Sequence, residues 1–512
     1  MRISKTLKSK NIGLIVSYLL LLADCAVGIF YTPLLLNALG STQYGLYDLV
    51  NSVANYIAVV DIGLGATVTR YIIKYKTSGE KEKEQSSIKT ALSSYLLLAG
   101  IAMTIGIILS LLLPQFLGGK EIGTSYQEAE TLMLVMSLNI AMSLFLHAFS
   151  GIALAYSYYS TEKVLKLCRL FIRLTLVVLI VNKTGTALSL AIIDVLLTIL
   201  MLFAYLVFFR WGKIKLLKGK FDFPLLKSML IFTVAILFQS LINQINTSSG
   251  KIIIGWKESS TNVITTFSII TQLYLLYCNM STVIQNIYYP SISEAVFSGE
   301  NKKQITRRII EPSRMQLLIL QIIVIGFMFM GRDFVTLWVG SQDGIQSEKI
   351  WFLSLVLMIS ALLHLSQNTI TCILKAKNIL KARTVILGIG ALCNIIISIM
   401  LIFITDSVFA VVIGLVVNNV LFNSIIMNIY YSKKEIVDVK LYFADTFSKQ
   451  LLAILITAGI GIVINILLPI TSWMALILKC AIILIGYIGC EMLLGLNKGE
   501  KEKIKSIINK KR

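Results

Sequence analysis

The sequence predicts an all-α polytopic membrane protein with about 14 transmembrane helices. Three observations predict this fold class: long apolar segments, basic residues on alternate loops, and an internal duplication. Hydrophobic residues make up 56% of the chain and charged residues only 14%. A hydrocarbon core of about 30 Å is crossed by roughly 20 apolar residues in a helix. The segments that meet this requirement cover residues 12–36, 45–70, 89–113, 126–149, 162–182, 186–209, 228–254, 262–289, 309–331, 350–374, 381–404, 408–430, 449–468 and 473–494.

The positions of the basic residues indicate which ends of these segments are cytoplasmic. The chain carries 47 Lys and Arg and a net charge of +21. Most of them fall on the N-terminus, the C-terminus and the even-numbered loops, whereas Lys479 lies in the last helix. The positive-inside rule therefore predicts that both termini are cytoplasmic, and that the charge faces anionic lipid rather than nucleic acid. The remaining loops, predicted to be external, hold only Lys120, Lys183, Lys251, Lys257, Arg332 and Lys349.

The first apolar segment follows a basic stretch, residues 2–10, as a signal peptide would. Its apolar run is too long for a signal peptide and no small-residue cleavage site follows, so we expect a retained helix. The longest loops reach about 20 residues, too few for a soluble domain. The seven cysteines lie in or beside membrane segments without metal-type spacing. We therefore expect no disulfide, no metal and no cofactor.

Two loops and the two histidines indicate a duplication. The stretch Ser78-Gly79-Glu80 recurs as Ser298-Gly299-Glu300, and His147 and His364 are separated by nearly the same interval. An even number of helices between the copies inserts both the same way up. This predicts two six-helix bundles related by a pseudo-two-fold axis along the membrane normal, with two further C-terminal helices. The expected divisions are residues 1–220, 221–440 and 441–512. Two similar lobes suit a transporter that opens a shared site to either side.

Polar residues recur at helical spacing on four segments. They either line a hydrated cavity between the lobes or form ordinary hydrogen bonds between helices. Our candidates for the cavity wall are Gln239, Asn243 and Asn246 in the seventh helix, Gln272, Asn279 and Asn286 in the eighth, His147 beside Asn139, Ser143 and Ser150 in the fourth, and His364 and Gln367 in the tenth.

Few ionisable residues lie at membrane depth, where a charge costs about 3 kcal/mol. The acidic candidates for ion coupling are Asp24, Asp61 and Asp194. Asp24 lies at the midpoint of the first helix. Three interpretations remain open for it: a coupling-ion site, a partner for a basic group in the cavity wall, or a neutral acid bonded to a neighbouring helix.

Basic residues near the cytoplasmic helix ends either reach the headgroups or form a vestibule for a phosphate-bearing substrate. Arg169 and Arg173 are one helical turn apart, and we expect them to receive the phosphate. The cytoplasmic candidates are Arg70, Arg169, Arg173 and Arg314. Lys251 is a further basic candidate that lies deeper in the membrane or nearer the outside.

Two stretches carry a resemblance to a known family. Residues 40–47 read GSTQYGLY, and residues 61–70 read DIGLGATVTR. Together they resemble the opening of Wzx-type polysaccharide flippases of the multidrug/oligosaccharidyl-lipid/polysaccharide (MOP) exporter superfamily. Asp61 and Arg70 match the family's second-helix motif. The fourteen-helix plan extends the resemblance over the whole chain.

The resemblance implies a bacterial plasma-membrane flippase rather than an enzyme. Its substrate would be an undecaprenyl-pyrophosphate-linked oligosaccharide, moved outward by alternating access for capsule, O-antigen or exopolysaccharide synthesis. Glycosyltransferases and a polymerase would be its partners. The polar segments are richer in Asn and Gln than in Lys and Arg, which favours sugar contacts over a strongly cationic lumen.

Three alternatives remain. A lipid II flippase would carry a related polyprenyl pyrophosphate, and a multidrug or cation exporter of the same superfamily would usually have twelve helices. A membrane polysaccharide polymerase or ligase would need a large external loop with catalytic Arg or His. The largest external loop, residues 331–349, has one Arg and no His.

Overall fold

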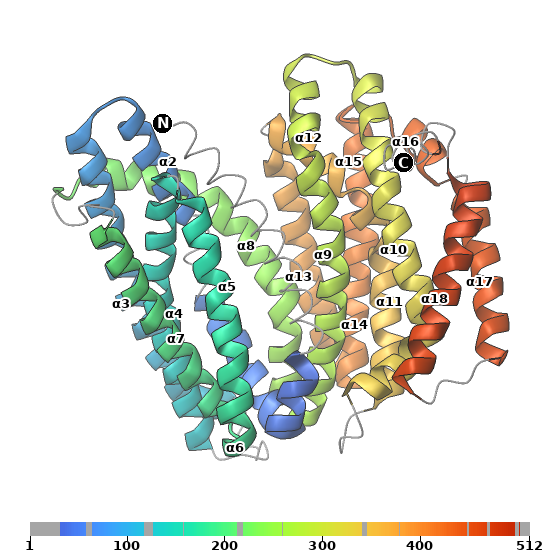
Figure 1. The fold of residues 1–512 in the computed structure, drawn as a ribbon, viewed down its shortest axis with the longest axis horizontal. Helices are drawn as coiled ribbons and strands as arrows, with labels where there is room; N and C mark the ends of the chain where they lie inside the picture. The colour runs from blue at the N-terminus through green and yellow to red at the C-terminus, as the bar shows by residue number, and fades with distance from the viewer. Residues whose placement is uncertain are drawn as a thin grey trace. The chain divides into compact units, whose positions relative to one another are not determined.

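The computed structural model describes residues 31–57, 64–116, 126–156, 158–211, 219–258, 260–339, 346–377, 379–447, 450–467, 472–496 and 501. Within these ranges every regular element is helical (Figure 1). Nine of the described helices are long and apolar enough to cross a membrane, and a shorter apolar helix covers Ala453–Ile466. The predicted all-α polytopic fold class is confirmed.

The chain forms two compact units. Among the described residues, the first unit extends to residue 268 and the second begins at residue 269. The first unit extends beyond residue 220 because α8 (Phe223–Lys257) packs against α2 (Leu64–Thr77) and α3 (Lys81–Phe116). The expected three-part division stays a prediction.

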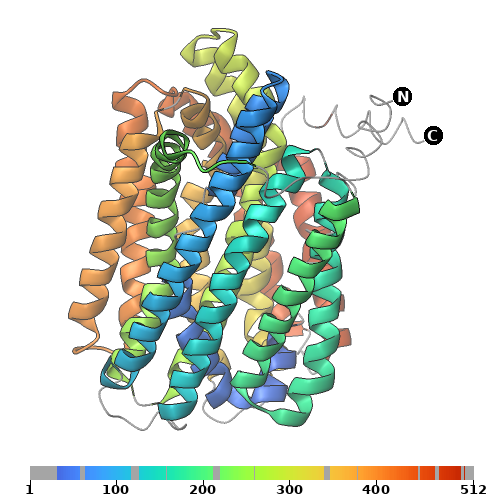
Figure 2. The ribbon, with the colours of Figure 1, turned by 90° about the vertical axis from the view of Figure 1, so that its left-hand side faces the viewer.

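In the first unit, α4 (Tyr126–Ala155) is the central helix, because it packs against α2, α3, α5 and α7 (Figure 2). The chain is also helical over residues 31–57, where Gly40 adopts a φ of 74°. Glycine reaches this left-handed conformation without steric cost, so the chain can turn there. The other elements are α5 (Tyr159–Leu176), the π-helix η2 (Val177–Val181), α6 (Asn182–Thr184), α7 (Ala187–Trp211) and the first residues of α9 (Thr261–Phe297).

The second unit contains most of α9 and all later helices. A buried apolar cluster around Ile309, Ile370 and Tyr442 joins its helices, and a second cluster around Ile325 and Tyr487 packs the C-terminal helices onto α10. The elements are α10 (Lys302–Val339), α11 (Ser347–Ser366), α12 (Asn368–Ala376), α13 (Leu380–Leu401), α14 (Ser407–Val417), the π-helix η3 (Asn418–Ile426), α15 (Met427–Lys433), α16 (Val439–Phe447), α17 (Gln450–Leu467), α18 (Trp473–Cys490) and the π-helix η4 (Glu491–Gly495).

The helices overlap the predicted segments but are longer at their polar ends. For example, α3 begins at Lys81 and α10 at Lys302, about two turns before the apolar residues. Hydropathy reports only the part of a helix that meets hydrocarbon, whereas backbone hydrogen bonds continue into the headgroup region. The short helix α16 was not predicted, since its nine residues are too few to span the membrane.

The duplicated loops have the same local structure. Gly79 and Gly299 both adopt left-handed conformations, with φ of 76° and 74°. In each loop the next residue donates its amide proton back into the preceding helix: Glu80 N to Tyr75 O at 3.0 Å, and Glu300 N to Ala295 O at 3.2 Å. This is the glycine-terminated helix end expected at such a turn. The recurrence in the sequence is therefore matched by a recurrence in backbone geometry.

The repeat also includes the start of α16. Asp222 N donates to Thr90 Oγ1 at 2.9 Å in the first unit, and Asp438 N donates to Thr306 Oγ1 at 2.9 Å in the second. The same two aspartates cap the helices that follow, since their Oδ1 atoms accept from the amides of the residues three positions later. The attachment of α8 to α3 thus recurs as the attachment of α16 to α10. The local repeat extends further along the chain than the twelve helices of the sequence-based prediction.

Two glycines on α3 give a test of this packing. A methyl group at Gly106 would overlap the Ser137 side chain on α4, whereas a methyl group at Gly100 would meet nothing within 4 Å. We expect Gly106→Ala to destabilise the protein by about 1–3 kcal/mol, because overpacking forces neighbours to shift. Gly100→Ala should leave stability unchanged or slightly raise it. Thermal unfolding of both variants in detergent measures the difference, and equal melting temperatures would contradict the close approach of α3 and α4.

Candidate functional site

A half-buried ion pair lies within the helices of the first unit. Arg173 on α5 donates to Asp194 on α7 through Nε at 2.6 Å and through Nη2 at 2.9 Å. The Arg173 guanidinium also lies over the ring of Tyr31, 4.9 Å from its centroid. Only 29% of the Arg173 side chain and 13% of the Asp194 side chain are exposed. Two parallel hydrogen bonds fix the geometry of the pair, so its two charges largely compensate one another.

Arg169 lies one turn before Arg173 and has a different partner. Its Nη2 donates to Thr198 Oγ1 at 3.1 Å. The Thr198 hydroxyl in turn lies 2.7 Å from Asn139 Oδ1 and 2.9 Å from the carbonyl oxygen of Asp194. Among the described residues Arg169 has no carboxylate within salt-bridge distance. It is therefore a guanidinium positioned by a neutral hydroxyl, with donors available for a ligand.

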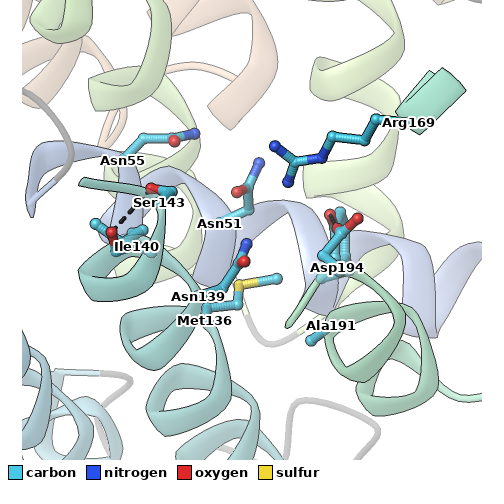
Figure 3. A pocket seen from close by; sticks show the side chains of 11 residues that line it. Asn51, Asn55, Met136, Asn139, Ile140, Ser143, Arg169, Ala191 and Asp194 are labelled. Atoms are coloured by element: carbon cyan, nitrogen blue, oxygen red, sulfur yellow. Dashed lines mark hydrogen bonds between the residues drawn. The ribbon is translucent and has the colours of Figure 1, made fainter. Parts of the chain in front are cut away.

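Arg169 and Asp194 border a cavity of about 220 Å³ (Figure 3). Figure 3 shows the side chains of Asn51, Asn139 and Arg169 converging on it from three helices. The wall combines amides and hydroxyls with a few apolar groups, and it is formed by Tyr47, Asn51, Ala54, Asn55, Met136, Asn139, Ile140, Ser143, Arg169, Ala191 and Asp194. Amide side chains both donate and accept hydrogen bonds, as sugar hydroxyls do.

A smaller cavity of about 60 Å³ also has Arg169 in its wall, and it is more basic. His147 from α4 and Lys166 from α5 line it with Arg169. Lys166 Nζ lies 2.5 Å from Glu162 Oε1, and the Glu162 side chain is buried. Ser150 donates to the same carboxylate oxygen at 3.2 Å. The other residues of its wall are Leu146, Leu165, Met201 and Tyr205.

Among the predicted candidates of the second unit, Gln367 forms hydrogen bonds to another helix. Gln367 and Asn428 exchange two amide hydrogen bonds, of 2.9 and 3.0 Å. His364 is half-buried, with its Nδ1 atom enclosed by protein. Gln272 is half-buried and Asn279 is exposed. These contacts agree with the alternative of hydrogen bonds between helices for Gln367.

Two predicted basic residues are not part of the walls of these two cavities and are held by protein groups. Arg314 is only 1% exposed, and it donates to the carbonyl oxygens of Asp445 at 2.9 Å and Gly495 at 2.6 Å. Its guanidinium therefore holds α16 and η4 rather than facing an open vestibule. Lys251 on α8 pairs with Asp48 at 2.6 Å, and both side chains are 14% exposed.

Several candidates cannot be placed against these cavities. Asp24 and Asp61 lie outside the described residues, and so do the side chains of Arg70, Gln239 and Asn286. Asn243 is exposed on α8 and Asn246 is half-buried there.

No group of three or more His, Cys, Asp and Glu side chains that could hold a metal ion occurs among the residues that the structure describes.

The sequence-based reasoning missed the ridge Tyr47, Asn51 and Asn55. The sequence did contain the pattern, because these three polar residues are spaced four apart and residues at that spacing share one face of a helix. The amides were overlooked because two asparagines in a helix next to a recognised motif do not form a long polar stripe. Asp48, which pairs with Lys251, follows Tyr47 and was missed for the same reason.

Comparison with known proteins agrees with this architecture. The sequence model of a family described as polysaccharide biosynthesis protein matches residues 12–297. No curated protein sequence gives a significant match.

Three solved structures are similar to the chain at low sequence identity. The lipid II flippase MurJ, in an inward closed conformation, is 15% identical with a TM-score of 0.70, and 94% of this chain and 98% of that chain are covered. An inward-facing multidrug resistance MATE family transporter of the MOP superfamily is 15% identical with a TM-score of 0.58, covering 82% and 95%. The MATE multidrug transporter DinF-BH is 14% identical with a TM-score of 0.57, covering 85% and 95%. The likeness establishes a shared fold, and this fold is one of membrane transporters.

The Arg173–Asp194 pair can be tested by a double-mutant cycle. Asp194→Leu or Arg173→Leu alone leaves one charge without its partner, and each should destabilise the protein by about 3 kcal/mol. The double variant should be more stable than either single variant, because neither charge remains. Unfolding in detergent provides the four stabilities. The exposed Glu80–Lys83 pair serves as the control and should show no measurable coupling. Additive effects at Arg173 and Asp194 would show that the pair contributes nothing to stability.

Proposed function

We propose that this chain, which belongs to the polysaccharide biosynthesis protein family, moves polyprenyl-pyrophosphate-linked oligosaccharides across a membrane. It would carry the undecaprenyl-linked unit from the cytoplasmic to the outer face of a bacterial plasma membrane by alternating access. Glycosyltransferases would supply the substrate, and a polymerase or ligase outside would consume it for capsule, O-antigen or exopolysaccharide. Both termini would be cytoplasmic, as the distribution of basic residues predicts.

The observation that carries this proposal is the chemistry around Arg169. The cavity joins one guanidinium to the amides of Asn51, Asn55 and Asn139. A guanidinium binds phosphate oxygens through two parallel hydrogen bonds, and amides bind sugar hydroxyls. A lipid-linked sugar pyrophosphate presents both groups next to each other.

The balance of charge favours an anionic substrate. Arg173 is compensated by Asp194, and Lys166 by Glu162, so Arg169 supplies the excess positive charge among the described residues of these walls. In a site of low dielectric constant, an anion at Arg169 would be favoured and a cation disfavoured.

Two alternatives fit these walls less well. A cation exporter needs an acid that can pair with its substrate, but Asp194 already accepts two hydrogen bonds from Arg173. A polysaccharide polymerase or ligase would have to break the bond between sugar and pyrophosphate, form a glycosidic bond to an acceptor hydroxyl and release the polyprenyl pyrophosphate. Such an enzyme would form product from the same lipid in detergent, whereas a flippase needs a membrane with two faces. A lipid II flippase shares the pyrophosphate and differs in its sugars.

Arg169→Gln tests the proposal. Loss of charge-assisted hydrogen bonds of about 1.5–3 kcal/mol should slow transport by roughly 10–100-fold. The measurement is the rate at which labelled polyprenyl-pyrophosphate-linked oligosaccharide becomes accessible on the opposite face of proteoliposomes. Arg169→Lys should recover part of the rate because it restores the charge.

The matched control is Arg210→Gln, which removes the same charge from the exposed end of α7 and should leave the rate unchanged. Transport by Arg169→Gln at the wild-type rate would refute the role of Arg169. Turnover of the lipid by the detergent-solubilised protein would favour the enzyme.

A further inference from the structure

The segment that begins α8 is fixed to α3 through its backbone. Ser86 Oγ donates to the carbonyl oxygen of Lys220 at 2.6 Å, and the Asp222 amide donates to Thr90 Oγ1 at 2.9 Å. The Asp222 carboxylate then caps α8, since its Oδ1 accepts from the Leu225 amide at 3.0 Å. The backbone of this segment is therefore held in one place without help from its larger side chains.

Four side chains of this segment are exposed. Phe221 is 49% exposed and Phe223 is 67% exposed, and Lys220 and Lys227 are exposed as well. The backbone is extended at Asp222, with φ of −123° and ψ of 104°, so the two phenyl rings project away from the side of the capping carboxylate. Phe223 and Lys227 are four residues apart and share one face of α8. We call these four side chains the α8 surface.

The second unit has the same backbone anchor but buries the equivalent positions. Asp438 holds the start of α16 through the same two hydrogen bonds. Counted from this aspartate, the equivalents of the α8 surface are Ile436, Val437, Val439 and Phe443. Ile436 and Val437 are 2% and 1% exposed, and the other two pack against the same buried apolar cluster. Protein thus covers this position in one copy, whereas the other copy presents rings and ammonium groups to its surroundings.

The neighbouring helices indicate the depth of the α8 surface in the membrane. The apolar span of α7 ends at Trp211, and the large exposed apolar side chains of α3 begin with Leu96 and Leu97, which are 64% and 66% exposed. Thr90, which holds Asp222, precedes Leu96 by about 9 Å along the helix. A headgroup layer is about 5–8 Å thick on each side of the hydrocarbon core. The α8 surface therefore lies near the headgroups, and the distribution of basic residues predicts the cytoplasmic leaflet.

The charge of this stretch is positive. Residues 213–227 contain five lysines and one acid, Asp222. Among the residues that the structure describes, neither Lys220 nor Lys227 forms an ion pair. Ammonium groups donate hydrogen bonds to phosphate oxygens, and phenyl rings pack against acyl chains. Phosphatidylglycerol offers a phosphate with a net negative charge, whereas phosphatidylcholine brings its own cation. The α8 surface therefore matches an anionic phospholipid.

We propose that the α8 surface binds an anionic phospholipid of the cytoplasmic leaflet, with its phosphate at Lys220 and Lys227 and its acyl chains against Phe221 and Phe223. The bound lipid would cover the start of α8, as protein covers the equivalent position at α16. It would thereby stabilise the connection between α7 and α8. This inference does not depend on the proposed function, because it concerns a different surface and a different lipid.

The test compares phosphatidylglycerol with phosphatidylcholine as the lipid next to the α8 surface. The reporter is Phe223→Trp in a full-length protein whose five native tryptophans are replaced by phenylalanine. In nanodiscs of both lipids, brominated phosphatidylglycerol should quench this tryptophan more strongly than brominated phosphatidylcholine does. Each lysine near a membrane surface adds roughly a fivefold preference for anionic lipid. Lys220→Gln combined with Lys227→Gln should therefore lower the preference by about 20-fold.

The control is Lys74→Gln combined with Lys81→Gln, which removes the same charge from the exposed ends of α2 and α3 in the same unit. It should change the preference by no more than about twofold, because salt screens charges that do not contact the lipid. An equal loss in the control would show general attraction to the membrane surface and overturn the proposal. Equal quenching by the two lipids before any lysine is changed would also overturn it.

A second measurement uses the protein with its native tryptophans. Phosphatidylglycerol added in detergent should raise the Tm by a few degrees. The rise should disappear in the Lys220 and Lys227 double variant and in Phe221→Ala combined with Phe223→Ala. An equal rise from inorganic phosphate would indicate a site for free anions, and a change of oligomeric state in these variants would indicate a contact with a second copy. Either result would replace the lipid as the occupant and refute the proposal.

Discussion

The cost of a charge in hydrocarbon governs the arrangement of the first unit. Arg173 and Asp194 satisfy one another through two hydrogen bonds, and Lys251 and Asp48 form a second half-buried pair. An unpaired charge at the bilayer centre would cost about 3 kcal/mol. In these two pairs each charge is compensated by its partner. Asp194 is therefore already paired, and Arg169 binds a neutral hydroxyl and faces a cavity. A single guanidinium then sets the electrostatic character of the wall.

The same local devices build both units. A left-handed glycine ends the helix at Gly79 and again at Gly299, and an aspartate caps the next attached helix at Asp222 and again at Asp438. These positions lie in polar loops, where hydropathy gives no information. Their recurrence shows that the same backbone connections between helices occur in both units.

The fold was largely predictable, because lipid imposes a simple rule on length and polarity. Segments such as 126–149 and 381–404 lie within or close to α4 and α13, so only the ends of these two helices differ from the prediction. The site was less predictable. The spacing of Arg169 and Arg173 suggested a joint role, but the pairing of Arg173 with Asp194 joins helices that one sequence cannot place side by side. The short amide ridge at Asn51 and Asn55 had too few members to stand out.

The contacts of Arg314 have an evolutionary consequence. Its acceptors are main-chain carbonyls, those of Asp445 and Gly495, and every amino acid provides a carbonyl. Substitutions at position 445 can therefore accumulate without disturbing the anchor, provided that the backbone keeps its course. In aligned relatives the arginine would be conserved, whereas the residues whose carbonyls it contacts would vary. Methods that infer proximity from correlated substitutions would therefore overlook one of the most buried polar contacts in the second unit.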